Sequence, residues 1–137
     1  MYAGCPIIWS SKLQMQVALS ITEAEYISLS QSLKEVIPVI NLLNEMKENN
    51  ISSISSVPNV YCKAFKDNSG ALELAKLPRM RPRTKHINLV YHHFREYDRT
   101  RVIQLFPITT LNQLADIFIK PLPREHFFNS RKAIMGW

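Results

Sequence analysis

The sequence predicts an α/β fold built around one core. Residues 22–43 repeat apolar side chains at helical spacing, residues 60–76 read as a strand, a polar turn and a helix, and residues 102–106 favour another strand. Strands that alternate with helices are typical of sheets covered by helices. The 137 residues are enough for a single domain, residues 1–137. A composition of 46% hydrophobic and 20% charged residues excludes a disordered or collagen-like protein.

The first part of the chain is expected to form two strands and a long helix. The run Ile7-Ile8-Trp9 and residues 15–19 favour strands. The segment Thr22-Glu-Ala-Glu25 matches a capping box, which would open the helix at Thr22. Pro38 has no backbone N–H to donate, so we expect a kink or break near Ile37. The apolar residues at helical spacing are Tyr26, Leu29, Leu33, Val36, Ile40 and Leu43.

The second part is expected to contain a strand-turn-helix unit followed by shorter elements. Residues 60–65 favour a strand, Asp67-Asn-Ser-Gly70 a polar turn, and residues 71–76 a helix. This turn would lie at the carboxyl end of the strand, where open α/β sheets place their ligand sites. The further elements expected are a helix from Thr84, a strand over 102–106, a short helix from Thr110 that ends before Pro121, and a helix over 124–137.

Three acids on separate elements are the candidate catalytic and metal-binding residues: Glu25, Asp67 and Asp116. Glu25 either completes a cap with Thr22 or faces the mouth of the sheet. Asp67 is either the N-cap of the helix after it or a ligand, and one residue can do both. Asp116 lies where Asp is a poor helix former, and it either forms an exposed pair with Lys120 or joins the other two acids. Carboxylates that converge in this way suit Mg²⁺ or Mn²⁺.

Positive charge is concentrated in one stretch of the chain. The formal net charge is +6, and eight of the 17 Lys and Arg residues fall between residues 76 and 101. Such a cluster either follows a phosphate backbone or forms a solvated surface. The eight residues are Lys76, Arg79, Arg81, Arg83, Lys85, Arg95, Arg99 and Arg101.

Other classes of function are poorly supported by the sequence. The two cysteines, Cys5 and Cys62, read as small buried hydrophobes in a reducing compartment, and no Cys-x-x-Cys pair suggests structural zinc. The sequence has neither a P-loop nor the Gly-x-Ser-x-Gly elbow of serine hydrolases. No apolar stretch is long enough to span a bilayer, and the first residues lack the features of a signal peptide. We therefore expect a protein that is neither secreted nor bound to membranes.

Six runs of residues spread over nearly the whole chain form a pattern in which order and spacing matter more than any single run. They are Trp9-Ser-Ser-Lys12, Ala18-Leu-Ser20 with Thr22-Glu-Ala-Glu-Tyr26, Asp67-Asn-Ser-Gly-Ala71, Arg83-Thr-Lys-His-Ile87, Tyr91-His-His-Phe-Arg-Glu96, and Gln113-Leu-Ala-Asp116 with Lys120-Pro-Leu122. Together they resemble the ribonuclease H domain at the end of copia-type retrotransposon polyproteins.

The resemblance implies an RNase H-like mixed sheet flanked by helices, and hydrolysis of the RNA strand of RNA–DNA hybrids during reverse transcription. It implies four carboxylates that hold two Mg²⁺ (or Mn²⁺) ions, and Glu25, Asp67 and Asp116 match three of the four. It also implies the upstream reverse transcriptase region as a partner, and a location in cytoplasmic virus-like particles or the nucleus. The residues expected to contact nucleic acid are Arg79, Arg81, Arg83, Lys85 and His86.

One carboxylate of the family pattern has no match. The family's first catalytic aspartate lies on its first strand, before the position of Tyr2, and residues 1–22 contain no acid. We therefore expect that the first strand is missing, and that the isolated chain binds metal weakly and cleaves little RNA. The alternatives are a non-catalytic, basic nucleic-acid-binding remnant and a pseudogene product without an enzymatic role.

Overall fold

The computed structural model describes residues 1, 4, 6–51, 60–76 and 92–137. Their contacts divide the chain into two compact units, a larger unit of residues 17–107 and a smaller unit that joins residues 1–16 to residues 108–137. The mixture of helices with a parallel two-stranded sheet confirms the α/β class.

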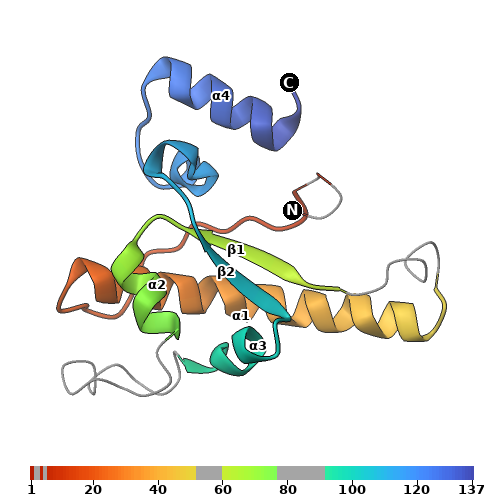
Figure 1. Ribbon diagram of the computed structural model, residues 1–137. Coiled ribbons are helices and arrows are strands. Elements are labelled where there is room, and N and C mark those ends of the chain that lie inside the picture. The colour runs from red at the N-terminus through yellow and green to blue at the C-terminus, as the bar shows by residue number, and fades with distance from the viewer. Residues whose placement is uncertain (2–3, 5, 52–59, 77–91) are drawn as a thin grey trace. The chain divides into compact units, whose positions relative to one another are not determined.

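In the described residues, the larger unit contains a long helix, two strands and two shorter helices, arranged as in Figure 1. In chain order these are α1 (Ile21–Glu48), β1 (Cys62–Lys66), α2 (Ser69–Lys76), α3 (Arg95–Arg99) and β2 (Ile103–Pro107). β1 and β2 pair in parallel, with Cys62 opposite Ile103 and Lys66 opposite Pro107. Parallel strands need a long crossover, and here the connection contains α2 and α3. In the described residues the sheet is this parallel pair, so a mixed sheet is not seen there.

One apolar cluster forms the core of the larger unit. α1 contributes the face predicted from its spacing as far as Ile40, with Tyr26, Leu29, Leu33 and Ile40 buried and Val36 packed against them. Burial of each such side chain stabilises the folded protein by about 1.5–3 kcal/mol. The last predicted member, Leu43, is not part of this cluster. The other buried members are Ile27, Ala71, Leu72, Leu74, Ala75, Phe94, Ile103 and Leu105.

Helix α1 begins earlier than its predicted capping box. Its N-cap is Ser20, whose Oγ accepts a hydrogen bond from the Glu23 amide at 3.1 Å. The Glu23 carboxylate reaches back and accepts from the Leu19 amide at 2.9 Å. The predicted cap of Thr22 with Glu25 is therefore wrong, because the overlapping pair Ser20 and Glu23 takes that role.

Pro38 does not break α1, contrary to prediction. The helix is continuous over 28 residues with Pro38 inside it and exposed to solvent. Leu33 and Ile40 are both buried in the core, one before and one after the proline. Tertiary packing on both sides therefore outweighs the local cost of the proline.

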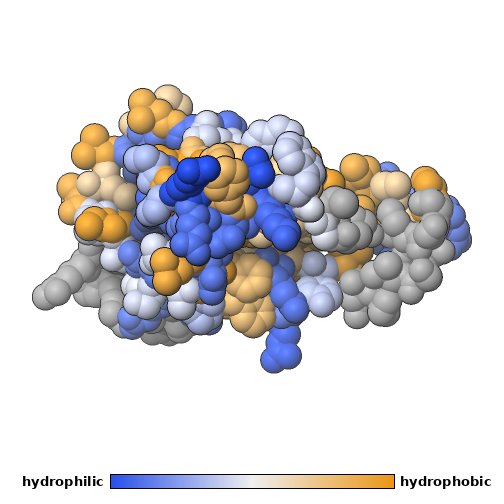
Figure 2. Space-filling model, turned by 90° about the horizontal axis from the view of Figure 1, so that it is seen from above, coloured by the Kyte–Doolittle hydropathy of each residue, from blue (hydrophilic) through white to orange (hydrophobic). Residues whose placement is uncertain are grey.

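The strands expected near the N-terminus are absent from the described residues. Residues 6–19 form no strand, and the large apolar side chains of this segment are exposed, whereas Ala18 packs partly buried against the core. In the face drawn in Figure 2, hydrophobic side chains also reach the surface among hydrophilic ones. A β-favouring run forms a strand only when a neighbouring strand satisfies its backbone groups, and none does so here.

The smaller unit is built of short helical elements. The helix expected from Thr110 is two 3₁₀ helices, η4 (Thr110–Asn112) and η5 (Leu114–Phe118), without a side-chain cap. The terminal helix α4 (Arg124–Met135) ends at Gly136, which adopts a positive φ of 81°. The helix expected from Thr84 falls largely outside the described residues. No helix in the described part of the chain is long and apolar enough to cross a bilayer.

Candidate functional site

Glu25 lies in the second turn of α1 because the helix starts at Ile21. Four-residue steps along the helix place Glu25 on the same side as the buried Leu29 and Leu33. The Glu25 side chain is partly exposed at the edge of this buried face, and Glu23 has taken over the capping role. The carboxylate of Glu25 is thus not needed for the helix cap.

Asp67 directly follows β1, but it does not cap α2. The neighbouring Asn68 does so, because its Oδ1 accepts a hydrogen bond from the Ala71 amide at 2.9 Å. The capping interpretation of Asp67 is therefore wrong. Its carboxylate is left free of the helix terminus, at the carboxyl end of a parallel strand.

Gly70 allows the start of α2 to approach the start of α1. A β-carbon built at Gly70 would lie 3.1 Å from both Cγ2 and Oγ1 of Thr22, closer than most real contacts. Thr22 therefore serves as a packing surface for α2. This close approach brings the Asp67 turn near the first turns of α1.

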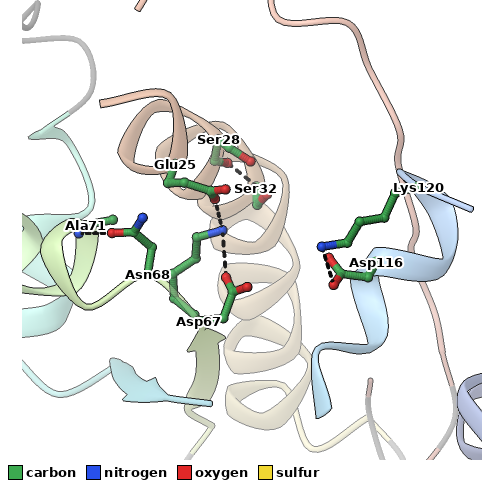
Figure 3. A network of polar contacts seen from close by, with 9 residues as sticks. Glu25, Ser28, Ser32, Asp67, Asn68, Ala71, Asp116 and Lys120 are labelled. Carbon is green, nitrogen blue, oxygen red and sulfur yellow. Dashed lines mark hydrogen bonds and ion pairs between the residues drawn. The ribbon is translucent and has the colours of Figure 1, made fainter. Parts of the chain in front are cut away.

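The carboxylates of Glu25 and Asp67 converge on one ammonium group. Lys66 Nζ forms an ion pair with Oε2 of Glu25 and lies 3.6 Å from Oδ1 of Asp67. Figure 3 shows Glu25 on α1 and Asp67 after β1 pointing toward the same point. Two of the three predicted acids, 42 positions apart in the sequence, are thus brought together around a cation.

Asp116 belongs to the smaller unit and lies within the short 3₁₀ helix η5. Its side chain is buried, and its Oδ2 lies 2.7 Å from Nζ of Lys120 (Figure 3). The predicted pair of Asp116 with Lys120 is confirmed, although the carboxylate is buried rather than exposed. Because this carboxylate is buried, it needs charge compensation, which the Lys120 ammonium group supplies.

The described residues offer two carboxylates, rather than a complete set, for a metal ion. In the described ranges, no group of three or more His, Cys, Asp and Glu side chains is arranged to hold a metal. Glu25 and Asp67 nevertheless supply the hard oxygen ligands that Mg²⁺ prefers. Mg²⁺ commonly binds through one or two carboxylates and keeps several water molecules, so the two side chains have suitable ligand chemistry, but the Lys66 ammonium group lies between them.

The predicted nucleic-acid contacts fall in a part of the chain outside the described residues. This applies to Arg79, Arg81, Arg83, Lys85 and His86.

Lys66 is the site residue that sequence reasoning missed. It lies two positions after Ala64, so it points to the same face of β1 as the core-facing residues. A lysine at an inward position directly before Asp67 is the signal that could have revealed it. Such a lysine needs a carboxylate partner close to the strand end.

The chain is similar to a short region of Pol polyproteins from plant transposons. It is 40% identical over 128 residues to the retrovirus-related Pol polyprotein from transposon RE2 of Arabidopsis thaliana. The identity is 36% over 126 residues for the polyprotein from transposon TNT 1-94 of Nicotiana tabacum, and 37% over 124 residues for that from transposon RE1 of Arabidopsis thaliana. These alignments cover 90–93% of this chain but only 8–9% of each relative. No family model and no solved structure matches.

The similarity confirms the retrotransposon part of the resemblance. The chain is homologous to a region of retrovirus-related Pol polyproteins and spans less than a tenth of their length. The names of these relatives do not specify which region this is, so the ribonuclease H identity stays a prediction.

Proposed function

We propose that this chain is part of a ribonuclease H domain of a copia-type Pol polyprotein, and that this domain hydrolyses the RNA strand of RNA–DNA hybrids. The convergence of the Glu25 and Asp67 carboxylates on the Lys66 ammonium group is the observation that carries the proposal. The homology to plant transposon Pol polyproteins supports it, since reverse transcription leaves RNA paired with DNA. On the resemblance alone, Asp116 would be a third carboxylate of the same site.

The chain's own residues would hold and orient a divalent cation. Glu25 projects from a long helix that the core holds in place, and Asp67 projects from a turn that Asn68 and Gly70 fix against α1. Both carboxylates are partly accessible to solvent, so a substrate phosphate can approach them. When bound, Mg²⁺ or Mn²⁺ would turn water into a nucleophile near neutral pH and stabilise the leaving 3′ oxygen.

The basic segment of residues 79–86 supplies the proposed contact with nucleic acid. Arg79, Arg81, Arg83, Lys85 and His86 lie within ten residues of one another in the sequence. Cationic side chains of this density bind phosphates and release counterions, so binding should weaken as salt rises. Recognition of a hybrid would depend on its shape and 2′-hydroxyl groups rather than its base sequence.

We further propose that the 137-residue chain alone is a poor catalyst. Residues 1–22 contain no acid, so the four carboxylates implied by the resemblance are incomplete within it. Fewer carboxylates mean weaker binding of the divalent ions that the reaction requires.

The test measures Mg²⁺-dependent cleavage of a labelled RNA strand in an RNA–DNA hybrid. It compares the 137-residue chain with a chain extended by the sequence encoded upstream. We expect cleavage by the extended chain, a loss of at least about 100-fold in Glu25→Gln and Asp67→Asn, and no change in the control Glu48→Gln. Glu48 is an exposed acid at the far end of α1. Full activity in Glu25→Gln would overturn the proposed site, and efficient cleavage by the short chain would overturn its proposed weakness.

A second candidate function is nucleic-acid binding without catalysis. The net charge of +6 favours it, as does the ammonium group that already neutralises part of the Glu25 and Asp67 charge. This function predicts salt-dependent binding of the hybrid with no cleavage by either length of chain.

A further inference from the structure

Lys66 occupies an unusual position for a lysine. It is the last residue of β1 and faces the same side of the strand as Cys62 and Ala64, which pack against the core. Only 13% of its side chain is exposed. A charged amine removed from water to this extent is stable only when nearby groups compensate its charge.

The compensation comes from the two carboxylates of the proposed catalytic site. Lys66 Nζ pairs with Glu25 Oε2 and lies 3.6 Å from Asp67 Oδ1. One positive charge thus separates two negative charges that would otherwise repel each other at short range. The cluster retains a formal charge of −1, which still attracts a cation.

We propose that Lys66 is an internal counter-cation of the site, and that a divalent cation binds Glu25 and Asp67 only when the Lys66 ammonium moves away. The inference rests on the proposed function for the identity of the site and adds a residue that controls its occupancy. Both cations need the same carboxylate oxygens, and they repel each other. The four-carbon lysine stem is flexible enough to carry the ammonium group into solvent.

Two opposite consequences follow from removing this charge. Without Lys66, the carboxylates repel each other, so the cation-free protein should become less stable. The same repulsion and the vacated space should make a divalent cation bind more tightly. A residue that only stabilised the fold would produce the first effect without the second.

The experiment measures Mn²⁺ binding by electron paramagnetic resonance and thermal unfolding with and without Mn²⁺, using the full 137-residue chain. For Lys66→Met we expect affinity for Mn²⁺ to rise by at least about tenfold and the Tm without metal to fall. Added Mn²⁺ should raise the Tm of this variant more than that of the wild type. Lys66→Arg keeps the charge and should retain the weak affinity of the wild type.

Control variants separate the local effect from general electrostatics. Lys63→Met removes a charge from the exposed face of the same strand and should leave the affinity for Mn²⁺ unchanged. Adding Glu25→Gln to Lys66→Met should abolish the gained affinity. If Lys66→Met fails to fold, Lys66→Gln, which can still donate hydrogen bonds to the carboxylates, replaces it.

Unchanged Mn²⁺ affinity in a folded Lys66→Met or Lys66→Gln variant would overturn the inference. This result is distinguishable from failure of the proposed function. Absence of hybrid cleavage together with gained Mn²⁺ affinity would reject the ribonuclease and keep the counter-cation. Cleavage that depends on Glu25 and Asp67, together with unchanged Mn²⁺ affinity on loss of Lys66, would keep the ribonuclease and reject the counter-cation.

Discussion

The hydroxyl of Tyr26 on α1 forms a hydrogen bond with Nδ1 of His92, which lies three residues before the start of α3. Tyr26 is fully buried, and the two rings are in contact. Burial, reinforced by the positive charge of Arg95, lowers the pKa of His92 from 6.5 to about 4. Burial also raises the pKa of the Tyr26 hydroxyl, so near pH 7 the hydrogen bond joins a neutral imidazole to a neutral hydroxyl.

This arrangement predicts that the protein loses stability as the pH falls from 6.5 toward 4. In the unfolded chain His92 titrates near its usual pKa of 6.5, so in this range the unfolded state binds more protons than the folded state. The stabilising effect is complete above pH 6.5 and is lost as the pH falls through the folded pKa. Urea unfolding across this range measures it. In His92→Asn, which keeps an acceptor and cannot titrate, the decline should be shallower, and equal declines would contradict the prediction.

The cap of α1 gives a second prediction. Ser20→Ala removes the oxygen that accepts from the Glu23 amide and should lower the free energy of unfolding by about 1 kcal/mol. Ser28→Ala is the matched control, because it removes a hydroxyl from the exposed side of the same helix without touching the cap. Denaturant unfolding of both variants measures the difference. Equal stability of the two would show that Ser20 is not the cap.

The N-terminus of α1 shows where sequence patterns are ambiguous. Two possible capping boxes overlap, one starting at Ser20 and one at Thr22, and each has a glutamate three positions later. The same ambiguity separates Asp67 from Asn68, since both residue types cap helices. The hydrogen bonds accepted by Ser20 Oγ and Asn68 Oδ1 show which residues cap, and local sequence does not distinguish the two candidates in either place. The start of α1 was therefore predictable to within two residues, and its capping residue was not.

The strands and the site show a second limit of sequence reasoning. β1 and β2 were predicted to within about two residues because their apolar residues pair with each other. The β-favouring residues 7–9 and 15–19 have no such partner and form no strand. The convergence of Glu25 with Asp67 followed from the resemblance. The position of Lys66 next to Asp67 was visible in the sequence, but its pairing with Glu25 on α1 depends on tertiary structure.

Pro38 gives a third prediction. The proline lies inside a continuous helix and is exposed, so its replacement costs no packing and restores a hydrogen bond to the Lys34 carbonyl. Pro38→Ala should raise the free energy of unfolding by about 2 kcal/mol, because the roughly 3 kcal/mol helix penalty is partly offset by a more flexible unfolded chain. Asn41→Ala, one turn later and also exposed, should gain less than about 1 kcal/mol. A destabilised Pro38→Ala variant would mean that the helix bends at this point to satisfy the fold.

The exposed N-terminal segment gives a fourth prediction. Leu13 and Met15 are each 93% exposed, and they alternate with polar residues as in a strand. An unpaired, alternating apolar segment favours association with a second copy of the chain. Replacing Leu13 and Met15 together by lysine should shift the protein toward monomer in sedimentation velocity runs at high concentration. The control replaces Gln14 and Gln16 by lysine, which adds the same charge and keeps the apolar row. If both double variants reduce association equally, net charge rather than the exposed apolar row drives it.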